Sequence, residues 1–258
     1  MIVREKFPGI KFIHFGEKTD PGTARNAGVK ESKGDIILFI DSDCIAAHNW
    51  IELLVNKHQN NEHAAIGGSV LNGNDPKSII AWAGYFAEFR EFIPERPEGE
   101  VSHIPTCNIS YKASVFKSIE GFNPDYYPQE DLEFNYRLIQ SGYNILFYPA
   151  ATIYHNHRTD LKSFFTHQKR VGQITSKMLR ILPIKGSTIV KNLFLTVILL
   201  PFLPIIKWIK TILVFSIYNR LLLFKNLSAL FVFAIGLVPW TLGFYSGLRS
   251  GYTKDKLK

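Results

Sequence analysis

The sequence predicts an α/β domain followed by an apolar helical tail. Short runs rich in β-branched residues alternate with helical segments between residues 10 and 157, and this alternation is typical of an α/β sheet. The tail is predicted by residues 226–248, a stretch of 23 residues without a charged side chain. We therefore expect an α/β domain over residues 1–182 and a membrane-associated tail over residues 183–258.

Charge divides the chain in the same place. Residues 1–160 hold 15 Lys and Arg against 21 Asp and Glu, whereas residues 161–258 hold 15 Lys and Arg against one acid, Asp255. The acidic balance of the α/β half argues against a nucleic-acid partner, and the basic, apolar half favours an anionic membrane surface. A hydrophobic content of 46% excludes a disordered chain, and two cysteines exclude a disulfide-rich scaffold.

The elements of the α/β half follow from local patterns. We expect strands at residues 10–15, 35–40, 64–70, 106–111, 144–147 and 152–154, and helices at residues 23–31, 48–59, 76–90, from 112, and 129–141. The run at 35–40 has the continuous apolar character of a fully buried strand in a parallel sheet. Asp41 and Asp43 follow it directly, at the carboxyl end where α/β sheets bind ligands.

The tail contains one strong candidate for a membrane span and one weaker one. Residues 226–248 are long enough to cross a bilayer, lie between Lys225 and Arg249, and alternatively fit a buried core helix. Residues 192–206 are uncharged but contain two prolines, so they either continue through residue 218 as a second span or stay re-entrant or interfacial. We therefore expect one or two transmembrane helices.

Two further segments bear on location. Residues 1–15 lack the apolar run of a signal peptide, which predicts that the α/β domain faces the cytosol at the cytoplasmic membrane. Residues 162–180 combine Lys and Arg with interleaved apolar residues. This segment either lies on anionic lipid headgroups or forms a solvated helix packed on the α/β domain.

Three polar groups have residue types suited to chemistry. Asp41 and Asp43 could hold a hard divalent cation, or could cap the next helix. Glu130 and Asp131 begin a helix, where they either supply a general base or favour the helix dipole. His155 lies at a predicted strand end and could bind the same metal.

The order of these groups is more specific than any one of them. Residues 21–44 read PGTARNAGVKESKGDIILFIDSDC, and residues 106–157 read TCNISYKASVFKSIEGFNPDYYPQEDLEFNYRLIQSGYNILFYPAATIYHNH. The A-R-N-x-G helix, the D-x-D strand end, the N-x-x-Y-K strand, the G-F turn, the E-D helix and the closing histidine resemble family 2 glycosyltransferases. That family has the GT-A fold, a Rossmann-like nucleotide-sugar domain, and its membrane-associated bacterial members often carry a hydrophobic tail.

The resemblance implies a donor site and a metal site. Asp43, with Asp41 and His155, is implied to hold Mg²⁺ or Mn²⁺ on the diphosphate of a nucleotide-sugar donor. The other implied donor-binding residues are Arg25, near the phosphates, and Asn108, Gly121 and Phe122, which line the sugar pocket.

The resemblance also implies the reaction. Asp131 is implied to deprotonate an acceptor hydroxyl, with Glu130 beside it, so that a single displacement inverts the anomeric configuration. The expected function is sugar transfer to a lipid-linked or polysaccharide acceptor at the cytoplasmic membrane face, as in cell-envelope polysaccharide biosynthesis. The alternative is a catalytically inactive, membrane-anchored remnant or scaffold of the same fold.

One part of the family pattern has no match here. Family members usually open with a strand–helix–strand unit that grips the nucleotide base and ribose, and no such pattern precedes Phe12. We therefore expect an N-terminally truncated domain. The open alternatives are a misassigned start, a fragment of a longer chain, or a partner that supplies the missing strands.

Overall fold

The structure is a computed structural model that describes residues 5–249, with the side chains of residues 189 and 193 left out. The predicted domain limits at residues 1 and 258, and Asp255, lie outside this range. The strands are β1 (Ile36–Phe39), β2 (Cys44–Ala46), β3 (Ala65–Gly67), β4 (Val70–Asn72), β5 (Gly99–Val101), β6 (Ile109–Lys112), β7 (Ile145–Phe147) and β8 (Ile153–His155).

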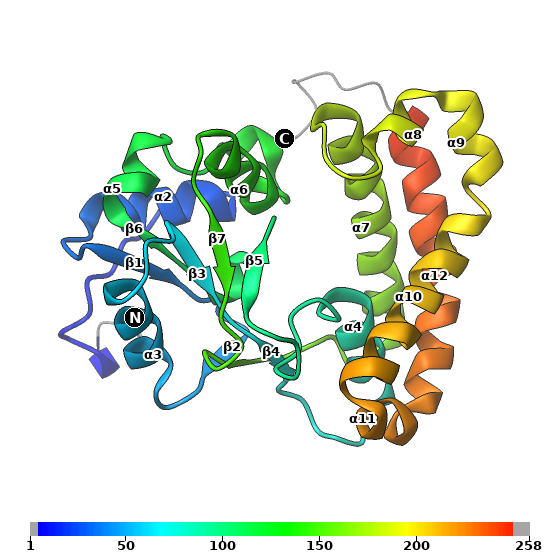
Figure 1. The fold of residues 1–258 in the computed structure, drawn as a ribbon, viewed down its shortest axis with the longest axis horizontal. Helices are drawn as coiled ribbons and strands as arrows, with labels where there is room; N and C mark the ends of the chain where they lie inside the picture. The colour runs from blue at the N-terminus through cyan, green and yellow to red at the C-terminus, as the bar shows by residue number, and fades with distance from the viewer. Residues whose placement is uncertain (1–4, 250–258) are drawn as a thin grey trace.

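The helices fall into two groups. Those of the α/β part are α2 (Pro21–Glu31), α3 (Trp50–Gln59), α4 (Ile79–Glu88), η1 (Thr106–Asn108), α5 (Ala113–Ser118), η2 (Pro124–Tyr126) and α6 (Glu130–Gln140). Those that follow are α7 (Leu161–Ile181), α8 (Ser187–Lys191), α9 (Leu193–Leu199), α10 (Phe202–Tyr218), α11 (Arg220–Lys225) and α12 (Leu227–Arg249). Figure 1 shows the two groups side by side, except that α4 lies against α12 of the second group, and the predicted α/β class with a helical tail is confirmed.

Two sheets organise the α/β part. The larger has the order β1-β6-β3-β7-β5, in which only β3 and β7 run parallel, and the smaller has the order β2-β8-β4. A cluster of aromatic side chains fills the space between the larger sheet and its helices. The rings of Phe39, Phe116, Phe122 and Phe134 lie 4.7–5.7 Å apart within this cluster. Such pairs add to the apolar burial that holds α5 and α6 on the sheet.

The prediction of a fully buried parallel strand at residues 35–40 is wrong in two respects. β1 pairs antiparallel with β6 and, within the described residues, has a neighbour on one side only. Its side chains alternate between half-buried and buried, with Ile37 and Phe39 facing the core. A short apolar run has the same sequence signature in both settings, so periodicity could not separate them.

Two other predicted strands differ from the structure. Residues 10–15 form no strand and are largely exposed, because no described strand lies beside them to accept their hydrogen bonds. The predicted strand at 64–70 is divided into β3 and β4, which belong to different sheets. The division falls at Gly68, where a Cβ would lie 1.7 Å from the carbonyl oxygen of Ala151. Only glycine permits this approach between the two chain segments.

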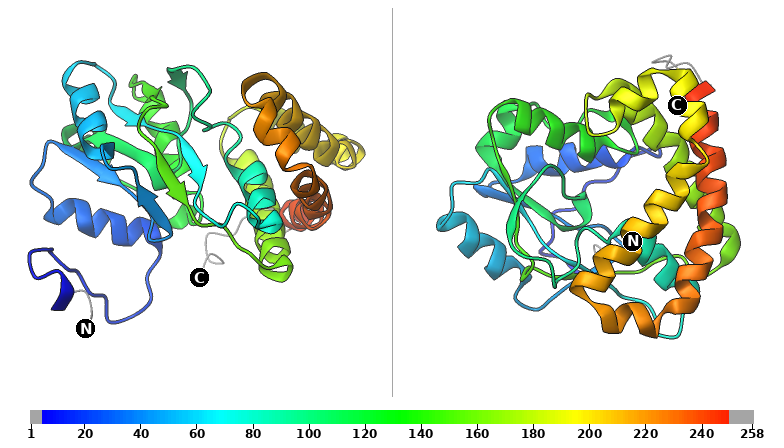
Figure 2. Two further views of the ribbon diagram at one scale, coloured as in Figure 1. Left: turned by 90° about the horizontal axis from the view of Figure 1, so that it is seen from below. Right: turned by 45° about the vertical axis from the view of Figure 1, so that its right-hand side comes forward.

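The long basic helix α7 packs along α12. Glycines bring the two backbones together: a Cβ on Gly172 would lie 1.9 Å from the carbonyl oxygen of Trp240, and one on Gly243 would lie 1.9 Å from that of Lys169. Arg180 at the end of α7 donates to the carbonyl of Leu248 at 2.7 Å. Later residues of α7 contact later residues of α12, so the two helices run parallel. Figure 2 shows the pair from two further directions.

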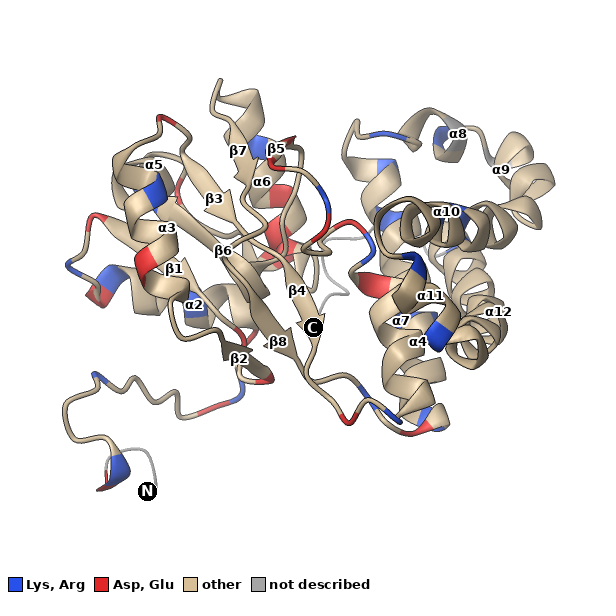
Figure 3. Cartoon of the chain, turned by 60° about the horizontal axis from the view of Figure 1, so that its bottom comes forward, with Lys and Arg blue, Asp and Glu red and all other residues tan. Residues whose placement is uncertain are grey.

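The helices α9 to α12 form the outer part of the molecule. Pro201 separates α9 from α10, so residues 192–218 make two helices instead of one long span. Within residues 5–249, α12 is the one helix long and apolar enough to cross a membrane, and 44% of its most apolar stretch is buried in the protein. Figure 3 shows that α9 and α12 carry almost no charged side chains, whereas Asp and Glu are spread over the α/β part.

The α7–α12 contact gives a stability prediction. Gly243→Ala should lower the free energy of unfolding by about 1–3 kcal/mol, because the added methyl group meets the backbone of α7. Gly28→Ala in α2 is the matched control: a Cβ there meets nothing within 4 Å, so the same change should be neutral or stabilising by about 0.5–1 kcal/mol. Urea unfolding of both variants measures the difference. Equal effects of the two changes would contradict the backbone contact.

Candidate active site

Arg25 joins the two acidic pairs that the sequence singled out. Its Nη2 donates to Oδ1 of Asp41 at 2.6 Å, and its Nη1 donates to Oε1 of Glu130 at 2.7 Å. The Arg25 side chain is 17% exposed and that of Glu130 is 5% exposed. Charge-assisted hydrogen bonds at such low exposure are stronger than surface ion pairs. The residues after β1 and at the start of α6 are thereby fixed to one another.

Local sequence places Arg25 at this position. Asp20 caps α2 by accepting from the backbone N–H of Thr23 at 2.8 Å, and Pro21 begins the helix, where a missing N–H costs nothing. Arg25 follows one turn later and points toward α6. Its guanidinium also lies over the ring of Phe122, 6.0 Å from the centroid.

The turn at Gly121 is held between α2 and α6. Gly121 has φ +68°, and a Cβ on it would lie 2.6 Å from Oδ1 of Asn26. Asn26 donates to the carbonyl of Phe122 at 2.7 Å and accepts from its N–H at 2.9 Å, while Arg137 donates to the carbonyl of Gly121 at 2.6 Å. The residue types of the G-F turn are therefore required by backbone shape and by close packing.

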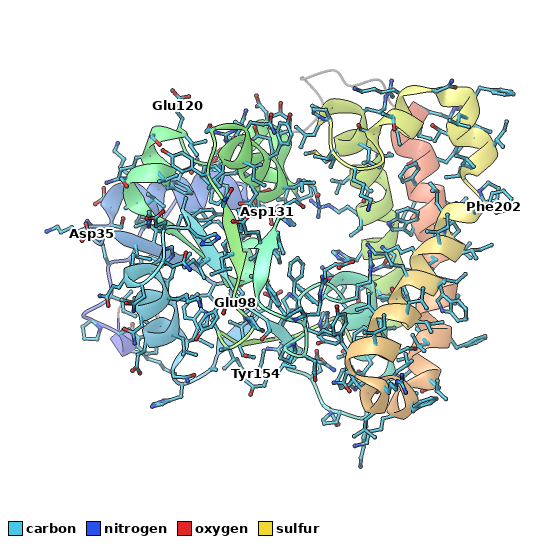
Figure 4. The ribbon with its side chains drawn as sticks, in the orientation of Figure 1. Asp35, Glu98, Glu120, Asp131, Tyr154 and Phe202 are labelled. Atoms are coloured by element: carbon cyan, nitrogen blue, oxygen red, sulfur yellow. The ribbon has the colours of Figure 1, made fainter. Side chains whose placement is uncertain are left out.

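Glu130 and Asp131 differ in environment although they are adjacent. Burial, and then the charge of Asp131, raise the pKa of Glu130 to about 7, against the opposing effect of Arg25. Asp131 is partly exposed, with Oδ1 accepting from the N–H of Leu132 at 2.7 Å and Oδ2 accepting from the N–H of Thr106 at 3.3 Å. Asp131 lies on the side of the α/β part that faces the helices, as Figure 4 shows. Of the two, only Asp131 presents an accessible carboxylate.

A second acidic group lies where β2 meets β8. Ligand atoms of Asp43, Cys44 and His155 all lie within 4.8 Å of one another, and Nε2 of His155 is 3.7 Å from Oδ2 of Asp43. The antiparallel register pairs Cys44 with His155, which brings these residues together. Carboxylate and imidazole together suit a divalent cation such as Mn²⁺. Asp41, placed with them by the sequence analysis, is instead bound to Arg25.

Two predicted donor-binding residues lie inside the core. Asn108 is fully buried; it donates to the carbonyls of Ser69 and Ala151 at 2.8 and 2.9 Å and accepts from Trp50 Nε1 at 2.7 Å. Phe122 is 2% exposed in the aromatic cluster. In this structure both side chains pack in the buried core, and their contact with a sugar stays a prediction.

A cleft of about 470 Å³ lies between the α/β part and α7, and Gln129, two residues before Asp131, lines it. Its polar lining comes from both sides of the cleft and comprises Glu88, His103, Gln129, Arg158, His167 and Arg170. Arg158 and Arg170 are exposed and form no ion pair with any described residue, although Arg170 lies 5.2 Å from the ring centroid of Tyr127. His167 pairs with Glu88 at 3.0 Å. The cleft therefore presents two guanidinium groups that form no ion pair with a described carboxylate.

Sequence reasoning missed several of these residues. Cys44 directly follows Asp43, but only the β2–β8 register shows that it joins the metal group. Asn26 lies inside the quoted helix motif and was given no role. Arg158 gave no local signal, and Arg170 belongs to the basic segment 162–180, for which a cleft was not predicted because its other lining residues are distant in sequence.

Comparison with known proteins points to one family over part of the chain. The profile described as Glycosyl transferase family 2 matches residues 2–120. The pre-mycofactocin glycosyltransferase of Mycobacterium tuberculosis is 25% identical over 169 residues, covering 63% of this chain and 36% of that protein. The glucosyl-dolichyl phosphate glucuronosyltransferase of Haloferax volcanii is 32% identical over 108 residues, covering 39% of this chain and 33% of that protein.

Two further similarities are to a curated relative and to a solved structure. The O-antigen chain rhamnosyltransferase WbaN of Salmonella anatum is 27% identical over 143 residues, covering 53% of this chain and 45% of that protein. The solved structure of S. aureus TarS 1–349 with UDP-GlcNAc aligns with a TM-score of 0.47 and 15% identity, over 96% of this chain and 78% of that one. The chain thus spans about a third of the length of the first two curated relatives.

The environment of Glu130 gives a prediction for stability against pH. Between pH 4.5 and 7 the folded protein holds a proton on Glu130 that the unfolded chain has lost, so the free energy of unfolding should fall as pH rises through this window. The fall should be on the order of 3 kcal/mol at most. Glu130→Gln cannot titrate and should show a flatter profile, whereas Glu120→Gln, on the surface, should follow the unmodified protein. Urea unfolding across this pH range tests it, and an unchanged slope in Glu130→Gln would refute the assignment.

Proposed function

We propose that this chain is a family 2 glycosyltransferase, whose profile matches residues 2–120, and that it transfers a sugar from a nucleotide-diphosphate donor to a lipid-linked or polysaccharide acceptor with inversion at the anomeric carbon. The proposed setting is the cytoplasmic face of the membrane. The named activities of three relatives, on pre-mycofactocin, glucosyl-dolichyl phosphate and O-antigen chain, support a glycan or lipid-linked acceptor.

The observation that carries the proposal is that Arg25 binds one member of each acidic pair, Asp41 and Glu130, and leaves the other member accessible. Asp43 lies with His155, and Asp131 lies two residues after Gln129, which lines the cleft. Displacement at an anomeric carbon needs this division, because the leaving group requires stabilisation of negative charge while the incoming hydroxyl must lose a proton. Arg25, bonded to Asp41 and Glu130, holds the two sides in register.

In the proposed reaction, Asp131 accepts the proton of an acceptor hydroxyl as its oxygen attacks the anomeric carbon. The bond from that carbon to the diphosphate oxygen breaks on the opposite face, and the nucleoside diphosphate leaves with the electron pair. Asp131 suits the role because it is partly exposed and held by the N–H groups of Thr106 and Leu132. Glu130 is buried and bound to Arg25, which favours a positioning role.

Asp43 and His155 are the proposed ligands for Mg²⁺ or Mn²⁺, with Cys44 beside them. A bound divalent cation neutralises charge on the departing diphosphate. Asp43 is suited to this because its side chain is 55% exposed and open to a donor, whereas His155 is held by β8.

We place the acceptor in the cleft lined by Arg158 and Arg170. These guanidinium groups lack anionic partners within residues 5–249, and they lie on the same cavity as Gln129, two residues before Asp131. Guanidinium groups bind phosphate oxygens in a bidentate manner. The cleft therefore favours an acceptor that carries phosphate near the reacting hydroxyl.

The role of Asp131 is tested by substitution. Asp131→Asn should lower the transfer rate by about 10²–10⁴-fold while donor binding stays within a few-fold, because a general base acts chiefly in the transition state. Asp125→Asn, an exposed acid of η2, is the matched control and should retain activity. The measurement is release of nucleoside diphosphate in a donor screen with membrane-reconstituted protein.

Near-normal transfer by Asp131→Asn would refute this mechanism. No release by the unmodified protein with any donor and acceptor would favour the inactive scaffold instead.

The metal site has its own test. Asp43→Asn keeps the shape of the side chain and removes its charge, so Mn²⁺ binding in the presence of nucleoside diphosphate should weaken by at least about tenfold. The EPR signal of free Mn²⁺ reports binding without any need for turnover. Asp75→Asn, in the loop after β4, should bind as the unmodified protein does. Equal affinity of Asp43→Asn would remove this residue from the metal site.

A further inference from the structure

The exposed apolar side chains of the tail gather on one face. On α12 they are Leu227, Phe231, Ile235, Val238 and Leu242, at spacings of three and four residues that define a single stripe. The same exposure continues on the neighbouring helices, at Phe194, Leu195, Val197, Ile198, Phe202, Ile205, Ile206, Ile209, Leu213, Ile217, Leu221 and Phe224. We call the whole set the outer apolar face. Figure 4 shows Phe202 at the edge of the molecule farthest from the α/β part.

Polar groups of the same helices point the other way. Lys207 lies 4.9 Å from the ring centroid of Trp240 on α12, and Lys210 pairs with Glu91 of the α/β part at 2.9 Å. These two lysines interrupt the apolar run of α10 in the sequence, yet in the fold neither of them lies on the outer apolar face. The layer formed by α9 to α12 is therefore amphipathic as a whole, although α12 alone is apolar all along its length.

The orientation of α12 excludes a simple crossing of the bilayer. α7 lies parallel to it at backbone contact and carries Lys169, Arg170, Lys177 and Arg180 beside residues 240–248. A bilayer crossed by α12 would place these charges in hydrocarbon, where they are costly. Figures 1 and 2 also show the α/β part beside α12 along its length, so the same bilayer would have to contain that domain.

We propose that α9 to α12 lie in the plane of the membrane, with the outer apolar face embedded in one leaflet and no segment of residues 192–249 crossing it. The occupant of this face is anionic lipid. Exposed cations border the face at Lys185, Lys191, Arg220, Lys225 and Arg249, and no Asp or Glu occurs between residues 161 and 249. Amphipathic surfaces bordered by basic residues bind anionic membranes in this manner. The proposal does not depend on transferase activity.

Depth measurements with nitroxide labels test this arrangement on the full chain. In a Cys44→Ser, Cys107→Ala background, single cysteines replace Leu227, Val238 and Leu242 on α12. Labels at all three exposed positions, in phosphatidylcholine and phosphatidylglycerol vesicles, should report the same shallow depth. A crossing helix would separate positions 227 and 242 by about 22 Å in depth. A label at Lys169, on α7 beside Gly243, should stay accessible to water.

Vesicle flotation provides a second measurement that needs no labels. Phe231→Asp should lower the affinity for these vesicles by about 10- to 100-fold, because one large apolar side chain no longer leaves water. Ile51→Asp changes an equally exposed apolar residue of α3, outside the face, and should bind as before. Three results would each overturn the proposal. The first is a depth gradient along α12, and the second is a label at Lys169 embedded in lipid. The third is absence of the α12 labels from lipid, which is expected if a second protein chain covers the face.

Discussion

The pair of hydrogen bonds from Arg25 is the interaction on which the rest of the site depends. Asp41 and Glu130 are 89 residues apart in the chain, and a single guanidinium fixes the distance between the segments that carry them. Arg25 occupies Oδ1 of Asp41 and Oε1 of Glu130. Their neighbour Asp43 is left exposed and Asp131 partly exposed. One buried cation thus divides each acidic pair into a structural member and an accessible member.

Much of this could be read from the sequence, because it depends on local chemistry. The helix after Asp20, the turn at Gly121 and the acidic start of α6 all have residue types that their backbone positions require. The sequence could not show which member of each acidic pair is structural and which is accessible, since this depends on which carboxylate binds Arg25. The membership of Cys44 in the metal group depends in the same way on the β2–β8 register.

The errors in the fold have a common physical origin. β1 was expected to be buried in a parallel sheet, and residues 192–218 were open to interpretation as a second span, because an apolar run alone does not state what covers it. In the structure β1 has one neighbouring strand, and α10 turns its lysines toward Glu91 and Trp240. The composition of these segments predicted that they are shielded from water. It did not predict which surface covers them.

The packing of α4 on α12 and the ion pair of Glu91 with Lys210 make the connection between the tail and the α/β part a rigid joint. The two parts therefore do not tilt freely as they would on a flexible linker, and the backbone contacts at Gly172 and Gly243 hold α7 on the same tail. The height of Asp131 above whatever surface supports α12 is then a constant of the fold. In the proposed reaction, this fixed height would favour acceptors whose hydroxyl stands at the matching distance from that surface.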